Sequence, residues 1–167
     1  MIIMHSETSP EPASRLFNAT ILSSAAGIFF GIYFLFIDPE TAIRIAAALM
    51  VGVVGLLSFL RHSVFYQSDQ SRLGWAQENP QFQIEVGLAN LSMGGAALTA
   101  ALLGWGSRTY GITLLIYGLY ISCTSLLHIR EALHLAEKKE HSLARIAISA
   151  VFALALLGFA VIAFHGA

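Results

Sequence analysis

The sequence predicts an all-α integral membrane protein, a single bundle of about five transmembrane helices. Two observations predict this fold class. The 167 residues are 56% hydrophobic and only 11% charged, whereas a soluble domain carries roughly 25% charged residues and needs them to cover its surface in water. The apolar residues are also gathered in stretches of about 20, the length with which an α-helix crosses the hydrocarbon core of a bilayer. Lipid is therefore the expected surroundings of the chain.

The first expected span is 16–37, which contains no charged side chain. Pro39 disfavours a helical conformation at the residue before it, so the span is expected to end there. Residues 1–15 are polar and lack the features of a secretory signal. We expect them to form a short disordered cytoplasmic arm, followed by a single transmembrane helical domain over 16–167.

The second expected span is 41–60, with Arg44 one turn inside its start, from where the guanidinium can reach back to the interface. The longest polar stretch, 61–83, follows. It contains four aromatic residues that are costly to leave in water, so we expect this loop to be ordered and packed on the bundle.

The remaining expected spans are 81–103, 109–127 and 143–164. Pro80 suits the first turn of the third span. Neither Gly nor Pro follows 127 closely, so the fourth helix is expected to continue beyond the membrane.

The lysines and arginines predict an orientation. Five spans place the amino terminus, the second loop and the fourth loop on one side, with Arg15, Arg61, Arg72, Arg130, Lys138, Lys139 and Arg145. The opposite side has Arg44 and Arg108. Because loops rich in Lys and Arg stay in the cytoplasm, the amino terminus is predicted to be cytoplasmic and the carboxyl terminus external.

The same topology brings several polar residues to the cytoplasmic ends of three spans, where ionisable groups are functional candidates. On the fourth span the candidates share one helix face, at spacings of seven, four and three residues. On the third span Glu85 shares a face with Ala89 and Ser92, and if that face meets the face on the fourth span, a polar wedge runs from the cytoplasm toward mid-membrane. The candidate ligand-binding or ion-pair cluster is Arg61, His62, Arg72, Glu85, Asn90, Tyr117, Thr124, His128 and Glu131.

Several interpretations of this cluster stay open. Glu85 could pair with Arg61 or Arg72, and His128 with Glu131, as interface anchors. The cluster could bind or transport a small polar molecule or ion, or serve a membrane enzyme that uses no metal. Two histidines and two carboxylates (His62, Glu85, His128 and Glu131) are also weak candidates for a zinc or iron site. The single Cys123 excludes an internal disulfide and a cysteine-based metal site.

The second loop and the start of the third span carry a resemblance. The pattern is Arg-His, Ser-Asp, Gly-Trp and then Phe-Gln-x-Glu-Val-Gly-x-Ala-Asn-Leu, and its matching residues are Arg61, His62, Ser68, Asp69, Gly74, Trp75, Phe82, Gln83, Glu85, Gly87, Ala89 and Asn90. About a fifth of the chain thus resembles a family of small bacterial inner-membrane proteins of unknown function. The resemblance implies a bacterial inner-membrane location and no particular activity.

Our leading functional interpretation is a non-enzymatic membrane protein, such as a small transporter-like, ligand-binding or accessory subunit with a polar cluster at its cytoplasmic mouth. The alternative is a metal-dependent membrane enzyme that uses the His/Glu cluster. The chain has no basic patch of the kind that binds nucleic acid. The sequence is compatible with a homo-oligomer or with a membrane-protein partner. It does not identify a substrate or a cofactor.

Overall fold

Long apolar stretches separated by proline and glycine turns form five helices that are long and apolar enough to cross a membrane, which confirms the predicted fold class. The computed structural model of the protein describes residues 9–74, 79–134 and 139–166, with the backbone alone at 131–134 and 139–145. Its elements, with π-helical segments labelled η, are α1 (Glu11–Leu35), α2 (Pro39–Ala46), η1 (Ala47–Val53), α3 (Val54–Phe59), η2 (Leu60–Val64), α4 (Tyr66–Leu73), α5 (Gln81–Leu103), α6 (Ser107–His134) and α7 (Lys139–His165).

Helix α1 begins at Glu11, so residues 11–15 are helical and do not belong to the arm expected over 1–15. Pro12 lies in the first turn, where its missing N–H removes no helical hydrogen bond. The hydroxyl of Ser68 accepts the Ala13 N–H at 3.1 Å and donates to the Ser9 carbonyl at 2.7 Å, which fixes this helix start against α4. Residues 1–8 of the expected arm lie outside the described residues.

The second span runs from Pro39 to Val64 as one helix in four segments and is longer than the expected 41–60. Asp38 caps its start, with a carboxylate that accepts the Glu40 N–H at 3.1 Å and the Thr41 hydroxyl at 2.6 Å. In its most apolar stretch, 50% of the residues are buried inside the bundle, whereas the corresponding share for α1 is 11%. The second span is therefore the central helix of the bundle.

The other three spans lie close to their expected places. Helix α5 ends where expected, since Gly104 takes the left-handed conformation (φ 68°) that stops a helix. Helix α6 is longer than the expected 109–127 and continues to His134, as the absence of Gly and Pro predicted. Helix α7 begins at Lys139, one turn before the expected 143.

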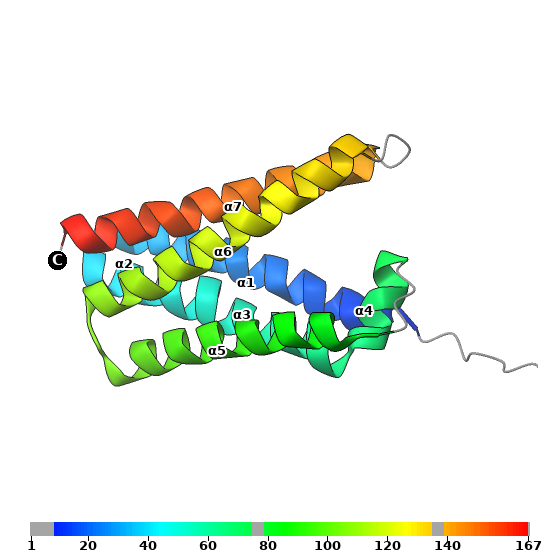
Figure 1. Ribbon diagram of the computed structural model, residues 1–167. Helices are drawn as coiled ribbons and strands as arrows, with labels where there is room; N and C mark the ends of the chain where they lie inside the picture. The colour runs from blue at the N-terminus through cyan, green and yellow to red at the C-terminus, as the bar shows by residue number, and fades with distance from the viewer. Residues whose placement is uncertain (1–8, 75–78, 135–138, 167) are drawn as a thin grey trace, which may run out of the picture.

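The five spans form one layered bundle (Figure 1). Helix α6 packs along α7, and the second span packs between α1 and α5. The short helix α4 lies at the end of the bundle where α1 begins, and α7 ends at the opposite end. The apolar core gathers around the middle of the second span and includes Met50, Val51, Tyr110, Leu114 and Leu156, all buried.

Glycines set how α5 faces the second span. A Cβ on Gly94 would lie 2.9 Å from the Gly52 carbonyl oxygen and 3.0 Å from the Gly55 Cα, so this contact needs glycine. The inward face of α5 therefore carries Gly87, Asn90 and Gly94. Ala89 and Ser92 do not lie on this inward face, and both are exposed.

Candidate functional site

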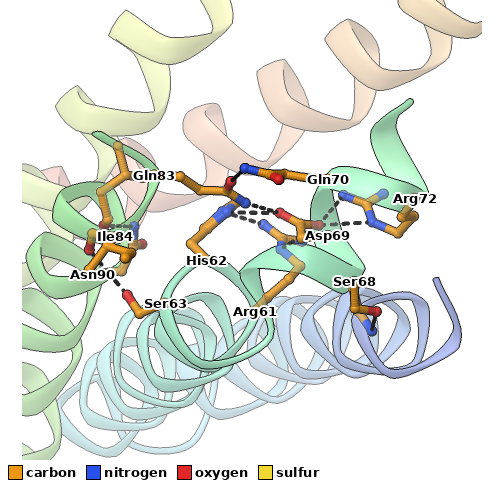
Figure 2. Close-up of polar contacts among 12 residues, drawn as sticks. Arg61, His62, Ser63, Ser68, Asp69, Gln70, Arg72, Gln83, Ile84 and Asn90 are labelled. Atoms are coloured by element: carbon orange, nitrogen blue, oxygen red, sulfur yellow. Dashed lines mark hydrogen bonds and ion pairs between the residues drawn. The ribbon is translucent and has the colours of Figure 1, made fainter. Parts of the chain in front are cut away.

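A buried carboxylate forms the centre of the polar cluster at the α4 end of the bundle. Asp69, on α4, has 0% of its side chain exposed. Its Oδ1 accepts from Arg72 Nε at 3.0 Å and Nη2 at 2.9 Å, and lies 3.7 Å from Arg61 Nε. Its Oδ2 lies 3.0 Å from His62 Nδ1 and accepts from Gln83 Nε2 at 3.3 Å. Figure 2 shows these groups, from the second span, α4 and α5, converging on the carboxylate.

Two consecutive residues of the π-helical segment η2, Arg61 and His62, both reach the Asp69 carboxylate. In an α-helix, neighbouring side chains diverge by about 100°. The η2 turn is wider, closed by the Phe65 N–H donating to the Leu60 carbonyl at 2.8 Å. Within it, Arg61 Nη2 lies 2.9 Å from His62 Nε2. Because a guanidinium can only donate, we assign Nε2 as the acceptor and place the proton of a neutral His62 on Nδ1, facing Asp69.

The charges at this site do not cancel. Burial acts to raise the pKa of Asp69, but the hydrogen bond from His62 and the charge of Arg61 outweigh it and hold that pKa below its ordinary value. Asp69 is therefore ionised and opposes two guanidiniums, those of Arg61 and Arg72. With His62 neutral, the described side chains of the site carry one positive charge more than they carry negative ones. Both guanidiniums also lie over the Phe17 ring, at 5.4 Å for Arg61 and 4.8 Å for Arg72.

A second polar group joins α5 to α6 beneath this cluster. The Tyr117 hydroxyl donates to Asn90 Oδ1 at 2.9 Å. The Asn90 amide donates to the Val86 carbonyl at 2.8 Å and to the Tyr120 hydroxyl at 3.4 Å. Asn90 and Tyr117 are both buried, so their hydrogen bonds fix the height of α6 against α5.

A half-open cavity of about 370 Å³ lies between the two polar groups. It brings together seven of the nine candidates that the sequence singled out: Arg61, His62, Arg72, Asn90, Tyr117, Thr124 and His128. Phe17, Leu73, Phe82, Val86 and Ile121 supply an apolar wall. Residues from all five spans and from α4 line this one space, including the three span ends that the predicted topology brings together.

Glu85 does not belong to this cluster. Its side chain is exposed, and among the described residues it forms no ion pair. The expected pairing of Glu85 with Arg61 or Arg72 is corrected, because both guanidiniums pair with Asp69. The glycine contacts of α5 turn Gly87 and Asn90 inward, and Glu85 then points outward.

The structure does not bring the four candidate metal ligands together within its described part. Among the described residues, no three His, Cys, Asp or Glu side chains come together as a possible ligand set. His62 lines the cavity, as does His128, but Glu85 does not. Glu131 lies on α6, and its side chain is outside the described residues.

The sequence reasoning missed Asp69 and Gln83 as site residues, although both belong to the resemblance pattern. One local signal for Asp69 was available. Asp69 precedes Arg72 by three residues, a spacing at which opposite charges on a helix meet. The contribution of Phe17 had no such signal, because it depends on where α1 crosses α4.

Comparison with known proteins identifies a family and no activity. A family model described as "Family of unknown function (DUF6790)" matches residues 16–167. No curated protein and no solved structure is detectably similar to the chain.

Proposed function

The chain belongs to this family of unknown function, and we propose that it is a non-enzymatic membrane protein that binds a small ligand with an acidic group. The proposed site is the cavity at the α4 end of the bundle. One observation carries the proposal: two guanidiniums line this cavity, and a single buried carboxylate holds both of them in place.

The size and the lining of the cavity support binding. Its volume of about 370 Å³ lies in the range of small-molecule sites, roughly 300–1,000 Å³. Such sites combine an apolar wall with a few polar groups that orient the ligand. Here Phe82 and Ile121 contribute to the wall, and Thr124 and Tyr120 contribute hydroxyls.

The charge of the cavity favours an acid. One guanidinium charge is left without a counter-ion, and the Nε of Arg61 is buried without a hydrogen-bond partner among the described residues. Guanidiniums bind carboxylates and phosphates through paired hydrogen bonds. Since Asp69 already restrains Arg61 and Arg72, little side-chain entropy is lost when a ligand binds.

The location is part of the proposal. We place the α4 end of the bundle in the cytoplasm and the bundle in a bacterial inner membrane. The bias of Lys and Arg supports the orientation, and the resemblance of the 61–94 segment supports the membrane. The ligand would then bind from the cytoplasmic side or from the inner leaflet.

Thermal unfolding of the purified protein in a neutral detergent tests binding. The probes are octyl phosphate and octylamine, which share one chain and differ in charge. We expect octyl phosphate to raise the melting temperature and octylamine to leave it unchanged, since a ligand that binds only the folded state stabilises it. Equal effects of the two probes, or no effect of either, would overturn the proposal.

Two substitutions on α6 test the place of binding. Thr124→Trp fills the cavity and should abolish the stabilisation by octyl phosphate. Cys123→Trp is the matched control. Cys123 is the residue before Thr124, and its side chain is exposed on another face of the helix. If octyl phosphate stabilises the Thr124→Trp protein as much as the control, the acid binds elsewhere.

A further inference from the structure

A second hollow lies between α5 and α6, two of the helices that surround the cavity. It measures about 220 Å³ and is lined by Ser92, Met93 and Ala96 of α5 and by Thr113 and Ile116 of α6. The hydroxyls of Ser92 and Thr113 donate to backbone carbonyls of their own helices, so the hollow itself presents a largely apolar surface. Both flanking segments lie within the membrane-crossing parts of α5 and α6.

The hollow and the cavity follow one another along the seam between α5 and α6. On α6, Ile116 lines the hollow, and Tyr120 and Thr124 line the cavity. These three residues are four apart and therefore lie on one helix face. On α5, Val86 lines the cavity and Met93 lines the hollow, seven residues or about two turns further along. The seam is thus polar at the α4 end and apolar towards mid-membrane.

The length of this seam fits a lipid chain. Gln83 lines the cavity and Ala96 lines the hollow. Thirteen residues of helix separate them, about 20 Å at 1.5 Å per residue. The hydrocarbon of one leaflet is about 15 Å deep, half of the bilayer core. A molecule that follows the seam therefore has its polar end at the membrane surface and its apolar end inside one leaflet.

We infer that the ligand is an acidic phospholipid of the surrounding bilayer, with its phosphate at Arg61 and Arg72 and one acyl chain along the α5–α6 seam. This inference rests on the proposed function and names its ligand class. The uncompensated guanidinium charge selects an anionic headgroup, as basic pockets between transmembrane helices do. The apolar hollow accounts for the chain, which a water-soluble acid lacks.

Native mass spectrometry of the full chain tests the inference. The protein is reconstituted separately with palmitoyl-oleoyl phosphatidylglycerol and with palmitoyl-oleoyl phosphatidylcholine, which have identical chains, and is then released into neutral detergent. We expect one phosphatidylglycerol to stay bound and phosphatidylcholine to be lost. Arg72→Gln should reduce the preference for phosphatidylglycerol about tenfold, as expected for one charge-assisted hydrogen bond. Arg108→Gln, an exposed arginine near the opposite end, is the control and should keep the preference.

A second pair of variants leaves the Asp69 cluster intact, in case Arg72→Gln does not fold. Ala96→Phe fills the hollow and should lower the retention of phosphatidylglycerol. Ala89→Phe places the same ring on an exposed position of α5 outside the hollow and should not. Equal retention in these two variants would overturn the assignment of the chain to the seam.

The two proposals fail separately. If octyl phosphate stabilises the protein but phosphatidylglycerol is not retained over phosphatidylcholine, the ligand is a soluble acid. The inference is then wrong while the proposed function stands. If neither acid binds, both are wrong.

Discussion

At the scale of single residues, the carboxylate of Asp69 has more partners than any other side chain described. It accepts hydrogen bonds from Arg72, His62 and Gln83 and lies beside Arg61. A buried ion pair adds little net stability over apolar packing, but removal of one partner leaves the other charges buried and uncompensated. The cluster therefore acts as a unit. Asp69 takes part in each of its ion pairs, so the loss of this carboxylate should destabilise the cluster most.

Asp69→Asn should destabilise the protein. The substitution keeps the shape and removes the one negative charge that faces Arg61 and Arg72 within the described part of the chain. We expect a loss of about 3–5 kcal/mol in the free energy of unfolding, measured by titration with a denaturing detergent in mixed micelles. Glu11→Gln is the control, since it breaks an exposed ion pair with Arg15 and should change little. A similar loss in both variants would show that the buried cluster contributes no more to stability than the exposed ion pair.

Stability should also depend on the ionisation of Asp69. The pKa of the Asp69 carboxyl is lowered in the folded protein, whereas in the unfolded chain the pKa of an aspartate is about 3.9. The unfolded chain therefore takes up the proton first as the pH falls. The contribution of Asp69 is fully present above the unfolded pKa and is lost as the pH falls through the folded pKa.

The measurement is the difference in unfolding free energy between the wild type and Asp69→Asn from about pH 5 to pH 3. We expect the difference to shrink towards the acid end. A difference that stays constant or grows on acidification would contradict the lowered pKa of Asp69.

The sequence predicts part of this site, and the reason is physical. Span ends are visible in composition, so Arg61, His62 and Arg72 could be assigned to one membrane surface. Which acid they meet depends on how α4 folds back and how α5 is rotated. The sequence analysis chose Glu85, but close packing at Gly94 turns Glu85 outward and leaves Asp69 as the partner.

At the scale of helices, the contact between α5 and the second span depends on glycine. Gly94→Ala should cost about 1–3 kcal/mol, because the new methyl group would meet backbone atoms that cannot move aside. Gly95→Ala is the matched control one residue along, where a Cβ meets nothing within 4 Å. It should be neutral or slightly stabilising, since alanine favours helix by up to about 1 kcal/mol. The measurement is the unfolding free energy of both variants in a denaturing detergent. Equal changes in the two variants would refute the close contact at Gly94.

Helix positions were largely predictable and helix type was not. Prolines and glycines at the turns are local signals, and α5 ends where they predict. The choice between an α-turn and a π-turn depends on the packing around it, so η1 and η2 had no local signal. In the described part of the 61–83 segment, Ser68 and Asp69 are buried, whereas Phe65 and Phe82 are exposed. Tyr66 is half-buried and Trp75 lies outside the described residues, so the packing expected from aromatic residues is corrected for Phe65 and Phe82 alone.

At the scale of the whole molecule, five helices of membrane-spanning length put the start of α1 and the end of α7 at opposite ends of the bundle (Figure 1). The predicted orientation rests on seven cationic residues on one side against two on the other. The number of such helices was predictable because lipid selects long apolar stretches, whatever the packing between them.

A fusion experiment tests the direction. A fluorescent reporter that folds only in the cytoplasm should give no signal when fused after Ala167 and a clear signal when fused after Leu73. An exported phosphatase at the same two positions should give the opposite result. Fluorescence from the Ala167 fusion would reverse the predicted orientation and move the proposed site to the external side.

The π-turn of η2 has a consequence for sequence comparison. A π-turn is closed by an i→i+5 hydrogen bond and so contains one residue more than the α-turn it replaces. Deleting one residue from 60–64 would restore an α-turn and rotate Arg61 and His62 relative to each other. In an alignment of relatives, a one-residue gap at this place should therefore coincide with loss of the acid at position 69. A family tree drawn from that gap would separate the members that have the buried carboxylate from those that do not.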